Sequence, residues 1–306
     1  MKRFDGEDPD LFEKLGAELA TAARDPEVER VVSDIVEQVR TGGDARLIAL
    51  TECFDGATLT SVDLRVSSEK LRVAREALSA EEHGAIEEAI ENIRAFHAHG
   101  HPENWTSTNS HGGTVGERHY PIRRVGVYVP GGKTPLVSTV LMTTILAKVA
   151  GVPQIAVTTP PRRDGTIEPA LLAALVLSGV DEVYKIGGAQ AVAALAHGTE
   201  TVSAVDKIFG PGNAYVNEAK RQVFGIVGID LLPGPSEIMV LADGTARPAY
   251  VAAALLAQAE HGSGKENVFL VGTDQSILKQ VLLEVEKQID ALTHRDAIRG
   301  VLERGF

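Results

Sequence analysis

The 306-residue sequence has a single cysteine, Cys53, and this scarcity excludes one means of stabilisation. One thiol cannot form an intramolecular disulfide, so the chain has to fold on its buried apolar surface alone. The sequence also does not open on the basic, then apolar, then small-residue pattern of a secretory signal. We therefore expect a protein of the reducing cytoplasm.

Long hydrophobic runs and an excess of positive charge are also lacking. The most apolar segment, 136–147, is interrupted by hydroxyl side chains and stopped by Lys148, short of the roughly 20 residues that cross a bilayer. The formal net charge of -12 at pH 7 disfavours polyanionic partners. We expect a soluble protein that binds neither a membrane nor nucleic acid.

The first third of the chain is charged and has the patterns of helices. A helix predicted over 26–40 ends at a glycine pair, and Asp44 is placed to cap the helix that follows. Ser79 and Glu82 have the spacing of a capping box at the start of another helix. These patterns predict packing elements rather than chemistry.

From about residue 120 the pattern changes to short apolar runs that end in Gly/Pro turns and are followed by Ala-rich helical segments. The runs are 125–129, 155–158, 182–186, 207–209, 229–232, 238–241 and 268–271. This alternation indicates parallel strands covered by helices. We expect an α/β protein with two parallel helix-flanked sheets, an incomplete Rossmann-like fold, and a helical amino-terminal region.

The length exceeds that of a typical single core, which suggests two domains. We expect residues 1–119, the amino-terminal helical segment, to pack with 236–306 as one domain. Residues 120–235 would then be an inserted α/β domain that carries nucleotide-binding turns.

Polar side chains stand in or beside three of the predicted strand-to-helix turns. Tyr128, Gln190 and Asn213 accompany glycines whose missing β-carbons allow a phosphate or a nucleotide to approach. Tight chain reversal explains the glycines equally well. The GxGxxG fingerprint with a following acidic residue is absent, so a standard Rossmann assignment fails. The three polar residues remain candidates for contacts to a ribose, an amide or an adenine.

Gln258 and His261 are three residues apart near the end of an Ala-rich helix, so their side chains share one face. They can converge on one metal ion, although a histidine on such a helix is more often a structural residue. Ser236 follows a predicted strand and can bond a polar substrate or cap a turn.

Two further patterns are rejected as sites. The segment 262–265 resembles part of a phosphate loop, but residue 266 is Glu rather than Ser or Thr, and the upstream glycine is missing. The alternating His97, His99 and His101 have no carboxylate or cysteine neighbours, which favours a solvated helix end over a metal site.

Five motifs in order resemble those of the histidinol dehydrogenase family: VYVPGG (127–132), GGAQA (187–191), VDKIFGPGN (205–213), GPSE (234–237) and QAEHG (258–262). The resemblance implies a cytoplasmic, NAD-dependent, zinc-containing homodimer of histidine biosynthesis. Its small-molecule substrate is an amino alcohol, L-histidinol, which it oxidises through the aldehyde to L-histidine. Zinc in that family orients the substrate while the nicotinamide takes the hydride.

The resemblance also implies roles by position. Tyr128, Gln190 and Asn213 match NAD contacts of the family. Substrate contacts are matched by Ser236, Gln258 and His261, of which the last two match zinc ligands. The family's catalytic Glu-His pair and its other two zinc ligands have no counterpart in this sequence, so no catalytic residue is assigned and we expect impaired turnover. The alternatives are a related dehydrogenase of a sulfonated diol and a non-catalytic nucleotide-binding fragment.

Overall fold

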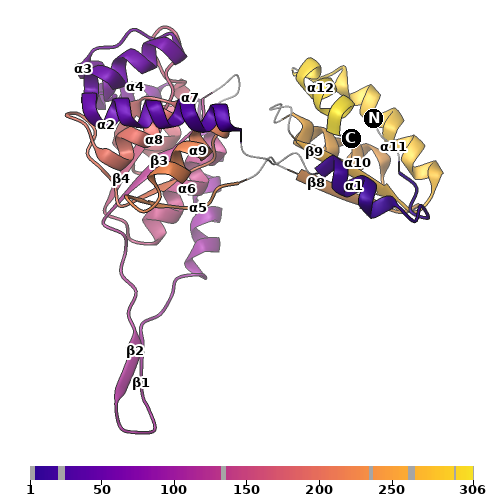
Figure 1. Ribbon diagram of the computed structural model, residues 1–306, viewed down its shortest axis with the longest axis horizontal. Helices are drawn as coiled ribbons and strands as arrows, with labels where there is room; N and C mark the ends of the chain where they lie inside the picture. The colour runs from indigo at the N-terminus through magenta and orange to yellow at the C-terminus, as the bar shows by residue number, and fades with distance from the viewer. Residues whose placement is uncertain are drawn as a thin grey trace. The chain divides into compact units, whose positions relative to one another are not determined.

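The computed structural model describes residues 4–19, 25–131, 136–233, 237–260, 266–292 and 294–305. Two compact units are formed, a larger one from 25–232 and a smaller one from the segments before 25 and after 232 (Figure 1). Among the described residues, no helix is both long enough and apolar enough to span a bilayer.

The larger unit contains a sheet of five parallel strands in the order β5-β4-β3-β6-β7. The strands are β3 (Arg124–Tyr128), β4 (Gln154–Thr159), β5 (Glu182–Lys185), β6 (Lys207–Phe209) and β7 (Gly228–Ile229). The predicted parallel sheet is thus confirmed. The last strand is shorter than its apolar run of 229–232, because Asp230 enters an ion pair with Lys220 and the two leucines that follow are exposed.

Helices cover both faces of this sheet, and each face has its own hydrophobic core. Successive residues of β3 point to opposite faces, so Tyr128 belongs to one core and Val127 to the other. The helices of the Tyr128 face are α2 (Pro26–Asp55), α8 (Gly188–His197) and α9 (Ala214–Val223). Those of the Val127 face are α4 (Ser68–Glu76), α5 (Ala80–Ala98), α6 (Val137–Val149) and α7 (Pro169–Leu177). The short α3 (Ser61–Leu64) follows α2. Strands buried on both sides explain the near-continuous Val and Ile runs.

The amino-terminal helices pack on the helices of this sheet. Helix α2 lies on α8 and α9, α4 on α7, and α5 on α6. Residues 25–119 therefore group with 120–232, whereas the division expected from the sequence groups 1–119 with 236–306.

Local signals in these helices are largely confirmed. The predicted glycine break occurs at Gly43, which is non-helical with φ 52 and ψ -142. The capping box is present, with the Glu82 N–H donating to Ser79 Oγ at 3.2 Å and the Ser79 N–H to the Glu82 carboxylate at 2.9 Å. Asp44, expected as a cap, has another role. Its buried carboxylate accepts the N–H of Thr201 at 3.2 Å, which ties α2 to the loop after α8.

An antiparallel hairpin that the sequence patterns did not indicate joins the helical region to the sheet. It consists of β1 (Trp105–Thr108) and β2 (Thr114–Glu117), and every residue in both strands is exposed. Figure 1 shows it projecting from the body of the larger unit. With no buried face it has no alternation of apolar and polar residues, which is the signal for a strand.

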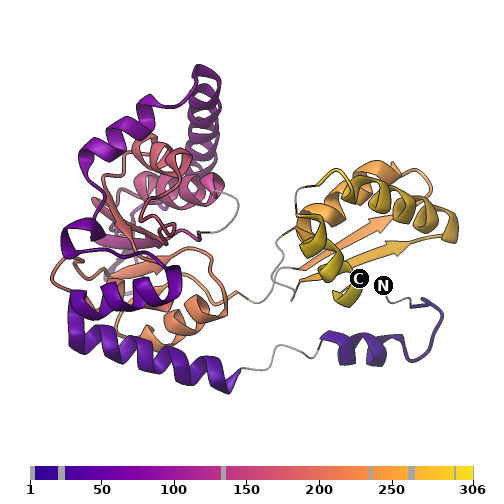
Figure 2. The ribbon, with the colours of Figure 1, turned by 90° about the horizontal axis from the view of Figure 1, so that it is seen from above.

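The smaller unit contains two parallel strands joined through a helix. The strands are β8 (Glu237–Ala242) and β9 (Asn267–Gly272), and Figure 2 shows them side by side. Its helices are α1 (Leu11–Leu19), α10 (Pro248–Ala259), α11 (Gln275–Ile289) and α12 (Arg295–Gly305). Helices α10, α11 and α12 form the core with one face of the sheet, while Met239, Leu241 and Val271 on the strands are exposed. The second predicted parallel, helix-flanked sheet is confirmed.

Candidate functional site

The strand order of the larger unit defines one point where ligands bind in open α/β sheets. From β3 the chain runs outward through β4 to β5, then returns to place β6 on the other side of β3. Ligands occupy the crevice at the carboxyl ends of the strands where this reversal occurs. The turns that follow β3 and β6 are therefore the place to look for a site.

Gly210, directly after β6, lies against the last residue of β3. A β-carbon at this position would lie 2.0 Å from the carbonyl oxygen of Tyr128, and the backbone has φ +117. Both facts require glycine here, because only a residue without a side chain fits this contact and readily adopts this φ. The glycine brings the two strand ends together at the point of reversal.

A buried ion pair holds the turn after β6 in place. Lys220, fully buried on α9, pairs with Asp230 and donates to the Gly210 carbonyl at 2.8 Å. The Asp230 carboxylate in turn accepts the Gly210 N–H at 2.9 Å. With both backbone groups of Gly210 engaged, the turn is fixed before any ligand arrives.

Asn213 ends this turn and caps α9. Its side-chain oxygen accepts the N–H groups of Tyr215 at 3.0 Å and Val216 at 3.1 Å, and the residue is exposed. Capping occupies the amide oxygen. The amide nitrogen remains to donate to a ligand.

Tyr128 is buried at the end of β3, and its hydroxyl oxygen accepts the N–H of Gly188 at 3.2 Å, in the first turn of α8. Burial raises the pKa of Tyr128 to about 12, and the nearby negative charge of Asp55 also acts to raise it. The phenol is therefore protonated at neutral pH, and its O–H can donate to an acceptor.

Three buried polar atoms in the same part of the larger unit have no hydrogen-bond partner among the described residues. They are Oγ1 of Thr158, Nε2 of Gln190 and Oδ2 of Asp55. Thr158 is the register neighbour of Tyr128 on the adjacent parallel strand, so their side chains share a face. Most buried polar groups in proteins are paired, and a local group of unpaired ones needs an explanation. A polar ligand bound here would supply the partners.

The structure also gives several of the glycines a packing role. A β-carbon at Gly131 or Gly187 would lie 2.3 or 2.4 Å from the ring of Pro160, which follows β4. At Gly188, with φ +60, it would lie 2.6 Å from the side-chain oxygen of Gln190. Close packing of adjacent turns therefore accounts for these glycines, and it is the polar side chains that point to a ligand.

The residues predicted from the sequence fall into two groups. Tyr128, Gln190 and Asn213 all lie at the strand ends or helix starts that face the point of reversal, as the turn argument requires. Ser236 and His261 lie outside the described residues. Gln258 is on α10, and its buried Nε2 has no partner within the described part of the chain.

Sequence reasoning missed Asp55 and Thr158. Thr158 has the same signal as Tyr128, a polar residue near the end of an apolar strand, and could have been found from it. Asp55 carries no such signal, because it ends a long charged helix and only tertiary burial distinguishes it from other carboxylates.

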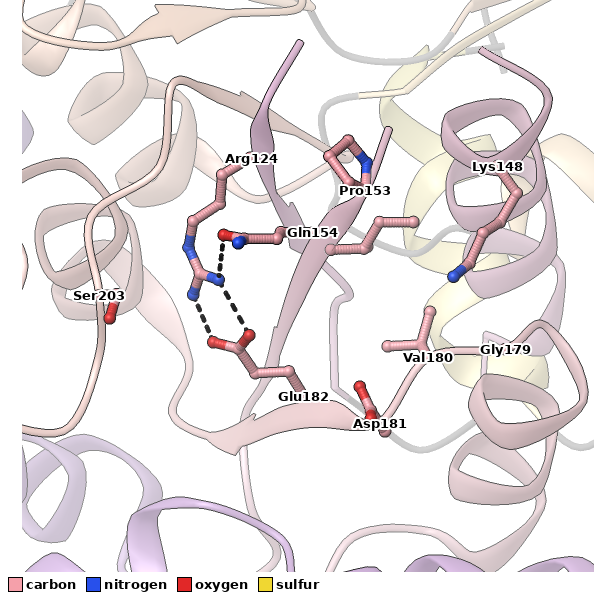
Figure 3. Close-up of a pocket in the computed structure, with 10 residues that line it drawn as sticks. Arg124, Lys148, Pro153, Gln154, Gly179, Val180, Asp181, Glu182 and Ser203 are labelled. Atoms are coloured by element: carbon pink, nitrogen blue, oxygen red, sulfur yellow. Dashed lines mark hydrogen bonds and ion pairs between the residues drawn. The ribbon is translucent and has the colours of Figure 1, made fainter. Parts of the chain in front are cut away.

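A cavity of about 400 Å³ lies at the opposite, amino-terminal edge of the sheet (Figure 3). Arg124, Gln154 and Glu182, at the starts of β3, β4 and β5, line it, and Arg124 donates to the Glu182 carboxylate at 2.9 Å. Burial acts to raise the pKa of Glu182, but the hydrogen bond from Arg124 brings it below its ordinary value. Arg124 and Glu182 form an ion pair, and although Arg124 Nε is buried without a partner among the described residues, this cavity lies away from the point of reversal. We therefore place the candidate site at the carboxyl edge.

The fold and this edge define an α/β protein of the doubly wound class, with helices on both faces of a parallel sheet. Residues 19–306 match the sequence profile of histidinol dehydrogenase, and the chain belongs to the histidinol dehydrogenase family.

Individual relatives agree. The chain is 49% identical over 277 residues to the histidinol dehydrogenase of Geobacillus kaustophilus, covering 90% of this chain and 65% of that protein. It is 52% identical over 248 residues to that of Symbiobacterium thermophilum, covering 81% and 56%. The crystal structure of histidinol dehydrogenase from Elizabethkingia anophelis superposes with a TM-score of 0.86 at 41% identity, covering 93% of this chain and 65% of that one. The chain thus spans less than two thirds of the length of each of these three.

Proposed function

We propose that this chain provides the nucleotide-binding part of an NAD-dependent, zinc-assisted dehydrogenase that oxidises L-histidinol through the aldehyde to L-histidine. Membership of the histidinol dehydrogenase family supports the reaction class. The observation that carries the nucleotide site is the group of unpaired buried polar atoms beside Tyr128 at the carboxyl edge. We also propose that the protein works in the cytoplasm as a homodimer, as its family resemblance implies.

The residues at the carboxyl edge fit a dinucleotide. Tyr128, Gln190 and Asn213 each retain a donor for ribose or amide oxygens, and Thr158 can donate or accept. Bound NAD would supply a hydride acceptor. This chain's residues bind and orient it, because the Lys220–Asp230 pair fixes the turn that carries Asn213.

Zinc belongs to the proposal through the family alone. The predicted pair is Gln258 with His261, and only Gln258 is described. The described residues contain no group of three or more His, Cys, Asp or Glu side chains placed to hold a metal. A stable zinc site needs about three or four protein donors, and the described residues supply fewer. Ser236 remains the predicted substrate contact.

The test is calorimetric titration of NAD into the parent chain and into Gln190→Met. Methionine keeps the side-chain length and removes the unpaired amide, so the variant should fold at least as stably while NAD binds about three- to tenfold more weakly. Gln280→Met, at an exposed position on α11, is the control and should change neither quantity. NAD binding that is absent in the parent, or equal in parent and Gln190→Met, would contradict the proposal.

A further inference from the structure

Asp55 is an unpaired carboxylate beside the candidate nucleotide site. It is the last residue of α2, and Gly56 then turns the chain in a left-handed conformation with φ 69. The next residue, Ala57, is fully buried in the same core as Tyr128. Asp55 is therefore held on the face of the sheet where Tyr128 and Thr158 lie.

One oxygen of the Asp55 carboxylate has no partner among the described residues. Its Oδ2 is buried without a hydrogen-bond donor, and in the described part of the chain it forms no ion pair. Burial raises the pKa of Asp55 to about 6, so the group is mostly ionised at neutral pH. An ionised carboxylate with a buried, unpaired oxygen is costly unless donors reach it. The missing donors have to come from outside the described chain.

We propose that Asp55 binds the two hydroxyls of a ribose of the dinucleotide and thereby selects NAD over NADP; this rests on the proposed function. A carboxylate accepts two adjacent hydroxyls at once, which is the role of the acidic residue in other dinucleotide folds. The same negative charge repels a phosphate at the 2′ position. Here the acidic residue comes from an amino-terminal helix rather than from the sheet domain's own strands, which is why a GxGxxG-type sequence pattern does not reveal it.

The experiment measures the affinities of NAD and NADP for the parent chain, Asp55→Asn and Asp34→Asn by calorimetry. Asp34 is an exposed carboxylate near the other end of the same helix, so its variant removes the same charge far from the site. Asparagine preserves the size of Asp55 and removes an unpaired charge, so the variant should remain folded, which circular dichroism checks.

The parent and Asp34→Asn should prefer NAD to NADP, and Asp55→Asn should bind NAD about 10- to 100-fold more weakly. The affinity of Asp55→Asn for NADP should stay the same or rise, so the ratio of NAD affinity to NADP affinity falls. A purely structural role for Asp55 would weaken the binding of both nucleotides equally. If the parent chain binds NAD and Asp55→Asn has the same ratio of NAD to NADP affinity as the parent, this inference is overturned while the proposed function stands. A parent chain that binds neither nucleotide overturns the proposed function and this inference together.

Discussion

Substitution of Gly210 by alanine tests how tightly the ends of β3 and β6 are joined at the candidate site. The new β-carbon would lie 2.0 Å from the Tyr128 carbonyl oxygen, whereas a carbon and an oxygen in contact lie about 3.3 Å apart. The two strand ends must then separate by more than about 1 Å. Because both backbone groups of Gly210 are bonded to the Lys220–Asp230 pair, the turn cannot move without disturbing those bonds.

The control is Gly225→Ala, in which the backbone has a similar φ of +103 but no atom lies within 4 Å of the new carbon. Backbone strain costs both variants about 1–2 kcal/mol. Overpacking adds about 1–3 kcal/mol to Gly210→Ala alone, which gives it a total loss of about 2–5 kcal/mol.

Urea unfolding followed by far-UV circular dichroism measures both losses, and calorimetry measures NAD binding. Gly210→Ala should also bind NAD at least about tenfold more weakly, a change of about 1.4 kcal/mol, because the turn carrying Asn213 is displaced. Gly225→Ala should bind it as the parent does. Equal loss of stability in the two variants, or parental NAD affinity in Gly210→Ala, would show that the close contact between Gly210 and Tyr128 does not hold the site together.

Two further substitutions test the buried charges. Lys220→Met leaves Asp230 without its partner and should lower the free energy of unfolding by about 3–5 kcal/mol, measured in urea; a loss below about 1 kcal/mol would mean that the pair behaves as an exposed one. Burial raises the pKa of Asp55 from 3.8 to about 6. Between about pH 4 and pH 6 the folded chain therefore holds a proton on Asp55 that the unfolded chain has lost, and the free energy of unfolding falls as pH rises through this window. Asp55→Asn removes this pH dependence, so the free energy of unfolding of the variant, relative to the parent, should increase from pH 4 to pH 6 and stay constant above. A difference between the two that does not vary with pH would contradict this expectation.

The parallel sheet could be predicted because each strand is buried on both faces and so leaves an apolar run. Runs such as 155–158 and 207–209 are followed within two residues by Pro or Gly, and the structure places strands there within one residue at each end. The exposed hairpin of β1 and β2 leaves no such run and was missed for that reason. An apolar run in the sequence therefore indicates a buried strand, and an exposed strand leaves no such run.

Part of the candidate site could also be predicted from the sequence, and part could not. Tyr128, Gln190 and Asn213 could be proposed because they stand beside turns that the sequence marks with glycine. The Lys220–Asp230 pair and the environment of Asp55 could not, because both arise from segments that meet only in the folded chain. A lysine on an amphipathic helix such as α9 has the pattern of a solvated residue, yet Lys220 is fully buried.

A crystal structure of the chain grown with NAD would show directly whether the dinucleotide occupies the carboxyl edge of the sheet. We expect the dinucleotide across the carboxyl ends of β3 and β6, in contact with Tyr128, Gln190 and Asn213 and with a ribose against Asp55. Ordered NAD in the cavity beside Arg124 and Glu182 at the amino-terminal edge, with the carboxyl edge empty, would contradict it.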